Sequence, residues 1–124
     1  MKEEILTEKA PKPIGPYSQA IKSNGFIFLS GIIPIRTTGE MTKGDIAEQF
    51  QTIMGNAKSI LEAAGSSLEK VVKVTVYMKD LRDFEAMNKV YASTFSKPFP
   101  ARTTVQVAAL PRGVDIEVDF IATT

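Results

Sequence analysis

Apolar positions recur with a helical period in two segments of the chain. Over residues 45–64 they fall every three or four residues and form one continuous face, which predicts an amphipathic helix. Asp45, followed three residues later by Glu48, resembles a capping box at the start of this helix, and Gly65 suits its C-terminal end. A second helix is predicted over residues 81–95. Its apolar stripe consists of Phe84, Met87, Tyr91 and Phe95.

The other apolar runs have the period of two that is typical of strands. They span residues 17–23, 26–35, 71–79, 101–108 and 114–122. Asn24-Gly25, between the first two runs, predicts a tight hairpin turn. The prolines among residues 1–16 predict an extended segment without helix before the first strand.

These elements predict a single α+β domain over residues 1–124, with two layers: a mostly antiparallel sheet and two helices on one of its faces. The run "FIFLSGIIPI" over residues 26–35 is apolar on both sides, as expected of a strand that is buried on both sides. Two helices can cover only one face of the sheet. We therefore expect further copies of the same chain to cover the other face, in a homo-oligomer.

The residue types that the chain lacks restrict its chemistry more than its overall composition does. The 124 residues include no histidine and no cysteine. This excludes disulfides, a thiolate nucleophile, a zinc–cysteine site and a histidine base. The side chains that remain suit binding, or a reaction that needs little activation of the substrate.

Charge and hydropathy restrict the partners and the compartment to be expected. The formal net charge is +1 and no basic stripe stands out, so a nucleic-acid partner is not expected. No apolar run reaches the length of a transmembrane helix, and the N-terminus carries no secretory or transit signal. We therefore expect a cytoplasmic protein without a membrane partner.

One arginine near the C-terminus is a candidate for binding an anion. Arg102 follows "PFPA", whose prolines fix the backbone, and a rigidly placed guanidinium suits a carboxylate bound through two parallel N–H···O bonds. If the last two strands pair as a hairpin, Arg102 lies on the same side as Asp115, Glu117 and Asp119. Asp115 and Asp119 are interpreted as charges paired across an exposed face. Glu117 is then the plausible group to handle a proton or orient water.

Asn88 is a polar residue close to an apolar stripe. On a helix it lies within about 40° of Phe84, on the flank of the stripe of the second helix. Its amide either ties down a nearby backbone segment or reaches into a pocket at the helix–sheet edge. The sequence leaves both interpretations open.

Three segments together resemble a known family. "FPARTTVQVAALPRGVDIEVDFIA", with "PIGPYSQAI" and "SGIIP" upstream, resembles the RidA (YjgF-type) family of reactive-intermediate enamine/imine deaminases over essentially the whole chain. The resemblance implies a chorismate-mutase-like α+β fold and a homotrimer with ligand clefts between subunits. It also implies hydrolysis of 2-iminobutanoate and 2-iminopropanoate to the 2-keto acid and ammonia, with no cofactor and no metal.

The same resemblance assigns roles to individual residues. Arg102 matches the arginine that grips the substrate carboxylate, and Glu117 matches the carboxylate that holds the attacking water. Four further residues match groups that line the cleft or contact the ligand, the last of them through its backbone: Tyr17, Gly31, Asn88 and Thr104.

Three positions depart from the family pattern. Thr104 stands where many relatives carry cysteine, and Ile32 replaces a common glutamine. Phe120 stands where a small residue is frequent, and the sequence leaves open whether it alters the packing beside Glu117. Arg102 and Glu117 are both present, so a deaminase is the leading interpretation.

Rival functions remain on sequence grounds. A non-catalytic trimer that binds or senses a small carboxylate such as a keto acid needs Arg102 as much as an enzyme does. Ribonuclease or translation-inhibiting activity also occurs within the family, although the near-neutral charge argues against it here. A purely structural or chaperone-like trimer has no particular support.

Overall fold

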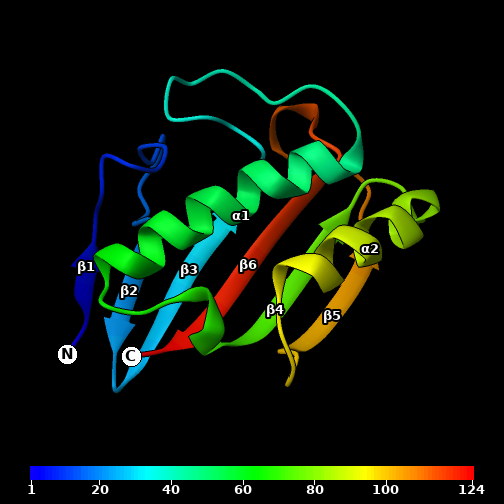
Figure 1. Cartoon of the computed structure of the whole chain (residues 1–124). Coiled ribbons are helices and arrows are strands. Elements are labelled where there is room, and N and C mark those ends of the chain that lie inside the picture. The colour runs from blue at the N-terminus through cyan, green and yellow to red at the C-terminus, as the bar shows by residue number, and fades with distance from the viewer.

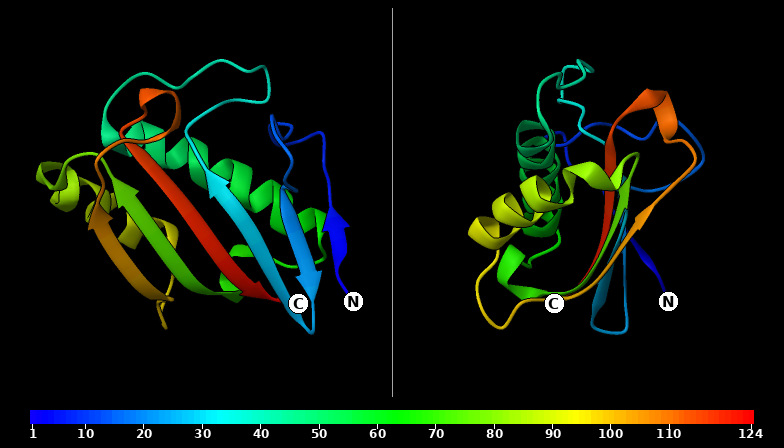
Figure 2. Two further views of the ribbon diagram at one scale, coloured as in Figure 1. Left: turned by 180° about the vertical axis from the view of Figure 1, so that it is seen from behind. Right: turned by 90° about the vertical axis from the view of Figure 1, so that its right-hand side faces the viewer.

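The computed structural model describes residues 1–124 as one sheet with two α-helices on one of its faces (Figures 1 and 2). The strand order is β1-β2-β3-β6-β4-β5, and every pairing is antiparallel except that of β4 with β5. This confirms the predicted two-layer α+β fold. The bounds are β1 Glu3–Ile5, β2 Ala20–Ser23, β3 Phe26–Ile32, α1 Ile46–Ala63, β4 Val71–Met78, α2 Phe84–Thr94, β5 Ala101–Gln106 and β6 Ile116–Thr123.

Helix α1 begins and ends where its sequence predicts. Asp45 accepts a hydrogen bond from the backbone N–H of Glu48 at 2.9 Å, which satisfies one free donor of the first turn. At the other end, Gly65 adopts a φ of +78°, where a side chain would be strained. The N–H of Ser66 reaches back to the carbonyl of Leu61 at 2.8 Å and closes the turn. Neither helix is long and apolar enough to span a membrane.

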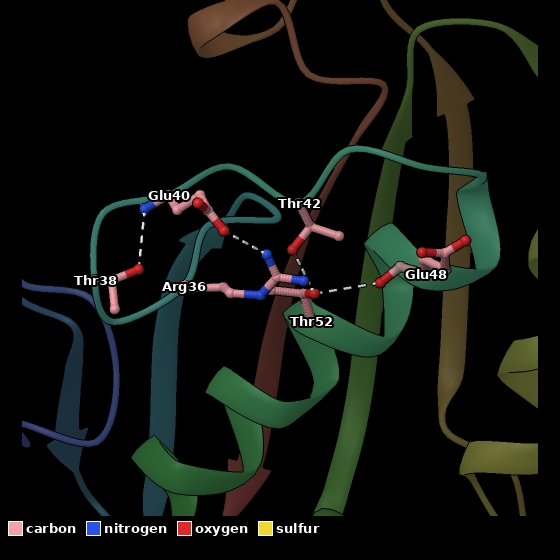
Figure 3. Close-up of polar contacts among 6 residues, drawn as sticks. All are labelled: Arg36, Thr38, Glu40, Thr42, Glu48 and Thr52. Carbon is pink, nitrogen blue, oxygen red and sulfur yellow. Dashed lines mark hydrogen bonds and ion pairs between the residues drawn. The ribbon is translucent and has the colours of Figure 1, made fainter.

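The loop between β3 and α1 is fastened to the helix (Figure 3). The hydroxyls of Thr42 and Thr52 are 2.7 Å apart, and Thr52 also donates to the carbonyl of Glu48 at 3.3 Å. Within the loop, Arg36 and Glu40 form an exposed ion pair at 3.0 Å. Of these contacts, the one between Thr42 and Thr52 ties the loop to α1.

The hairpin between β2 and β3 is confirmed. Asn24 and Gly25 both have positive φ, 52° and 79°, the backbone of a two-residue turn with the twist that antiparallel strands need. The extended N-terminal segment adds β1, which pairs with β2 at the edge of the sheet.

Strands β5 and β6 do not form the hairpin considered from the sequence. Strand β4 lies between them, pairing with β5 in parallel and with β6 antiparallel. Arg102 is therefore in register with Val74, and Val74 with Phe120. The side chains of Val74 and Phe120 are fully buried under the helices, so Arg102 lies on the helix-covered face.

The core fills the space between the sheet and the helices. Along β6 every second side chain is buried in it, namely Ile116, Val118, Phe120 and Ala122. Phe120 thus points away from the face that carries Glu117. The side chain of Phe120 therefore does not pack beside Glu117, because alternate residues of a strand lie on opposite faces.

The opposite face of the sheet carries exposed apolar side chains. Ile27 and Leu29 of β3 are in the core, whereas Phe26 and Phe28 are each 43% exposed on the open face, with ring centroids 6.2 Å apart. Val105 of β5 is also exposed there, in the row that contains Glu117. Strand β3 is therefore apolar on both sides, as its sequence indicates.

Candidate functional site

Arg102 is held by aromatic rings and not by an acid. Its guanidinium carbon lies 4.7 Å from the ring centroid of Tyr91 and 5.7 Å from that of Phe84. The ion pairs of the chain do not include it, and its N–H groups make no hydrogen bond to the protein. A half-buried guanidinium with all its donors free can bind an anion without first losing a partner.

Arg102 opens into a surface hollow between α2 and β5, here called the Arg102 hollow. Its walls are Asn88, Tyr91, Ala92, Phe99, Pro100 and Arg102. The half-buried amide of Asn88 makes no hydrogen bond within the chain. Of the two interpretations of Asn88, the tie to a backbone segment is wrong, and its position in a pocket at the helix–sheet edge is confirmed.

Two buried hydroxyls on this side of the sheet also lack partners. They are the phenol of Tyr91 and Oγ1 of Thr104. Burial raises the pKa of Tyr91, and the charge of Arg102 opposes that rise, so the phenol stays protonated at neutral pH. The Thr104 side chain shares the face of Arg102, two residues along β5.

Glu117 lies on the opposite face of the sheet. Its half-buried carboxylate rests against the α-carbon of Gly31 on β3. Burial, and to a lesser extent the charge of Asp119, raises the pKa of Glu117 above its ordinary value of 4.5. Asp119 accepts a hydrogen bond from the Tyr77 hydroxyl at 3.0 Å, whereas Glu117 has no hydrogen-bond partner in the chain. Such a carboxylate is a suitable proton acceptor.

Tyr17 lines a second hollow together with Gly31, here called the Tyr17 hollow. Ile32, Ile35 and Ile60 supply much of its apolar wall. The chain segment before β2 is held by the buried Gln19, whose amide nitrogen donates to the carbonyls of Thr7 at 3.1 Å and Pro11 at 2.9 Å. This amide anchors the loop that carries Tyr17.

The protein has no group of three or more acidic side chains placed to hold a metal ion, and it has no histidine or cysteine. The two hollows offer a guanidinium, amides and hydroxyls, and the Glu117 carboxylate, whose pKa is raised, lies outside them against Gly31.

Comparison with known proteins decides the family. A family model described as endoribonuclease L-PSP matches residues 7–124. Reactive Intermediate Deaminase A of Arabidopsis thaliana, a chloroplastic protein, is 46% identical over 98% of this chain and 66% of its own length. The chain belongs to the RidA family.

Solved structures of RidA-family proteins have the same fold. RidA from an Antarctic Psychrobacter superposes with a TM-score of 0.95 at 41% identity, covering 98% of this chain and 99% of that one. TdcF of E. coli, solved with bound serine, superposes with a TM-score of 0.91 at 38% identity, covering 98% of each chain.

Within this RidA-family chain the six candidate residues form two separate groups. Asn88, Arg102 and Thr104 lie at the β5 edge on the helix-covered face. The other group consists of Tyr17, Gly31 and Glu117, around β3 and the open face of β6. The expectation that Arg102 and the acids share a side is wrong. With β4 between them, β5 and β6 are also about 10 Å apart.

Sequence reasoning missed several residues that line these hollows or contact Arg102. Phe84 and Tyr91 were assigned only to an apolar stripe, yet their rings contact the guanidinium. Their spacing of seven places them two helical turns apart on one side of α2, with Asn88 between them. The sequence did carry a signal for this arrangement, namely two aromatic residues on either side of an amide along one helix. Gln19 carried no signal, because its partners are backbone groups.

Proposed function

We propose that the protein hydrolyses 2-imino acids, with 2-iminobutanoate and 2-iminopropanoate as substrates, to 2-keto acids and ammonia without a cofactor. A relative named as a reactive intermediate deaminase supports deamination as the general activity. The observation that carries the proposal is the free guanidinium of Arg102, which suits the carboxylate shared by all 2-imino acids. The bound serine of the E. coli relative is also a small molecule with a carboxylate next to a nitrogen-bearing carbon.

The reaction needs positioning more than activation. An imine carbon is already electrophilic, so water can add to it once the substrate is held. Glu117 takes a proton from the attacking water and delivers it to the imine nitrogen, giving a tetrahedral carbinolamine. Transfer of the hydroxyl proton to nitrogen then breaks the C–N bond and releases ammonia and the keto acid. Such proton transfer contributes typically about 10²–10⁴-fold to a rate.

A complete site in this proposal takes one group of residues from each of two subunits. Arg102 and Glu117 lie on opposite faces of one chain, so the Arg102 hollow of one copy has to meet Gly31 and Glu117 of a neighbour. Such a contact joins different surfaces of the two copies, and in this proposal three copies close it into a ring with one cleft at each interface. The proposal assigns Phe26 and Phe28, which are exposed in the single chain, to the centre of this homotrimer.

A non-catalytic carboxylate sensor is the second candidate, because an unpaired Arg102 serves binding alone equally well. The two functions differ in their need for Glu117. A sensor binds a keto acid whether or not Glu117 can accept a proton, whereas the hydrolase does not turn over without it.

The test is release of 2-ketobutyrate from 2-iminobutanoate generated in place by threonine dehydratase, with semicarbazide as competing scavenger of the imine. Wild type should accelerate release, and Arg102→Ala and Glu117→Gln should abolish the acceleration. Arg36→Ala, which removes an arginine of an exposed ion pair outside the Arg102 hollow, is the matched control. No acceleration by wild type, with 2-ketobutyrate still bound, would leave the sensor as the function.

A further inference from the structure

The guanidinium of Arg102 lies on an aromatic platform made by α2. Tyr91 and Phe84 approach it at 4.7 and 5.7 Å, within the range in which a cation is attracted to the face of a ring. Arginines placed for function often rely on an acid to hold them. Here no carboxylate is near enough to form an ion pair with Arg102.

Tyr91 is the fixed part of this platform. Its side chain is only 5% exposed, and its ring packs against Phe50 of α1 at 5.9 Å and Phe95 at 4.8 Å. The other wall, Phe84, is 36% exposed and has room to move. The position of the Tyr91 ring is therefore set by the packing of the two helices, independently of any ligand.

Stacking on a ring leaves the donors of the guanidinium unoccupied. A carboxylate partner would accept two of the five N–H groups and cancel the charge, whereas a ring face contacts only the plane of the group. A ring can therefore hold the guanidinium in place while its N–H groups stay available. Buried aromatic surface also excludes water from one side, which strengthens a hydrogen bond to an anion.

We propose that Tyr91 is a positioning residue, whose ring holds the Arg102 guanidinium flat and ready to bind a carboxylate. This inference rests on the proposed function only in that Arg102 binds the carboxylate of the substrate. Phe84 forms the outer wall of the same platform. The Tyr91 hydroxyl takes no part, because it is buried and has no hydrogen-bond partner.

The unpartnered hydroxyl makes the ring separately testable. Tyr91→Phe keeps the ring and removes a hydroxyl that bonds to nothing, whereas Tyr91→Leu keeps an apolar side chain and removes the ring face. Phe84→Leu removes the more exposed ring of the platform. It is the variant to measure if Tyr91→Leu lowers the yield of folded protein. Leu81→Ala, at a partly exposed apolar residue in the turn before α2, is the control for Phe84→Leu.

The measurements are the Kd for 2-ketobutyrate by titration calorimetry, and kcat and KM for 2-iminobutanoate. Tyr91→Leu should raise both Kd and KM about tenfold, as expected for loss of a partly desolvated cation–π contact, with a smaller change in kcat. Tyr91→Phe, which keeps the ring, should have the same Kd as wild type. In the Tyr91→Leu background, Arg102→Lys should weaken binding less than it does in wild type, because lysine and a mispositioned arginine both act as point charges.

The outcomes separate this inference from the proposed function. A folded Tyr91→Leu variant with unchanged Kd would overturn the positioning role while leaving the deaminase intact. Equal losses in Tyr91→Phe and Tyr91→Leu would overturn it too, by assigning the effect to the hydroxyl. If wild type neither binds 2-ketobutyrate nor hydrolyses the imine, it is the proposed function that fails.

Discussion

The carboxylate of Glu117 rests against the α-carbon of Gly31 so closely that position 31 has no room for a side chain. A Cβ built there would overlap Oε2 of Glu117 and lie 3.0 Å from Cδ. Gly31 has no positive φ, so its role is to leave space and not to permit an unusual backbone. The two residues face each other across β3 and β6, next to the irregular pairing between Leu29 and Ile32.

Gly31→Ala should therefore damage activity more than stability. The added methyl group meets the end of a flexible side chain, so the Glu117 carboxylate swings away and the backbone stays in place. We expect imine hydrolysis to fall at least about tenfold, as is common when a proton-transfer group is misplaced. Steady-state kinetics and chemical denaturation measure the two effects. An active but unstable variant would contradict this account.

Activity should rise with pH through the titration of Glu117. Only its deprotonated form accepts a proton from water, and its raised pKa puts the midpoint of kcat/KM above 4.5. Asp119→Asn removes a neighbouring negative charge and should move this midpoint to lower pH, although burial keeps it raised. Asp83→Asn, before α2, is the control and should leave the midpoint unchanged.

The same titration affects stability in the opposite direction. The folded protein holds the Glu117 proton more tightly than the unfolded chain does, because the pKa of Glu117 is raised by folding. The protonated carboxyl therefore adds to the free energy of unfolding in full below pH 4.5, and this addition is lost as pH rises through the folded pKa. Relative to Glu117→Gln, the free energy of unfolding of wild type should fall over this range. A rise would mean that the carboxylate gains a partner on folding.

Gly55 offers a test of helix α1 away from either hollow. It lies on the exposed side of the helix, and a Cβ there would meet nothing within 4 Å. Gly55 therefore takes no part in close packing on the sheet. Gly55→Ala should stabilise the protein by about 1 kcal/mol. Gly65→Ala, at a φ of +78°, should destabilise it by a similar amount or more. Denaturation at one fixed protein concentration compares the two.

The open face of the sheet should decide the oligomeric state. Phe28→Asp places a charge among exposed apolar side chains, and light scattering should show dissociation of the proposed trimer. Hydrolysis should be lost with it, because Arg102 and Glu117 then have no neighbour to complete the site. Leu81→Asp is the control, since Leu81 is also 43% exposed but lies in the turn before α2. A trimeric, active Phe28→Asp protein would argue against this interface.

Local patterns were enough to predict most of the elements. Both helices and the hairpin at Asn24-Gly25 follow from periodicity and from turn chemistry, which act between residues close in sequence. The strand order is different, because pairing between distant strands leaves little trace in either strand alone. The segments 101–108 and 114–122 look like a hairpin because a short turn joins them.

A signal for the correct pairing was nevertheless present. Strand β4, helix α2 and strand β5 follow one another as a β-α-β unit, which favours parallel pairing of its two strands. Parallel pairing puts Arg102 in register with the buried Val74 and so determines its face. The candidate residues could be named from the sequence, but their division into two groups required the strand order.

The position of β5 at the end of the sheet has a consequence for how the site can vary. An edge strand has only one neighbour, so about half of its backbone N–H and C=O groups point outward without a strand partner. Hydrogen bonds from a ligand or an adjoining subunit to these backbone groups depend on the position of the strand. They do not depend on which side chains the strand carries. A threonine in place of a cysteine at position 104 changes one side chain on the helix-covered face of β5 and leaves those backbone groups in place. Side chains along β5 can therefore change while the strand keeps the same outward-facing main-chain groups.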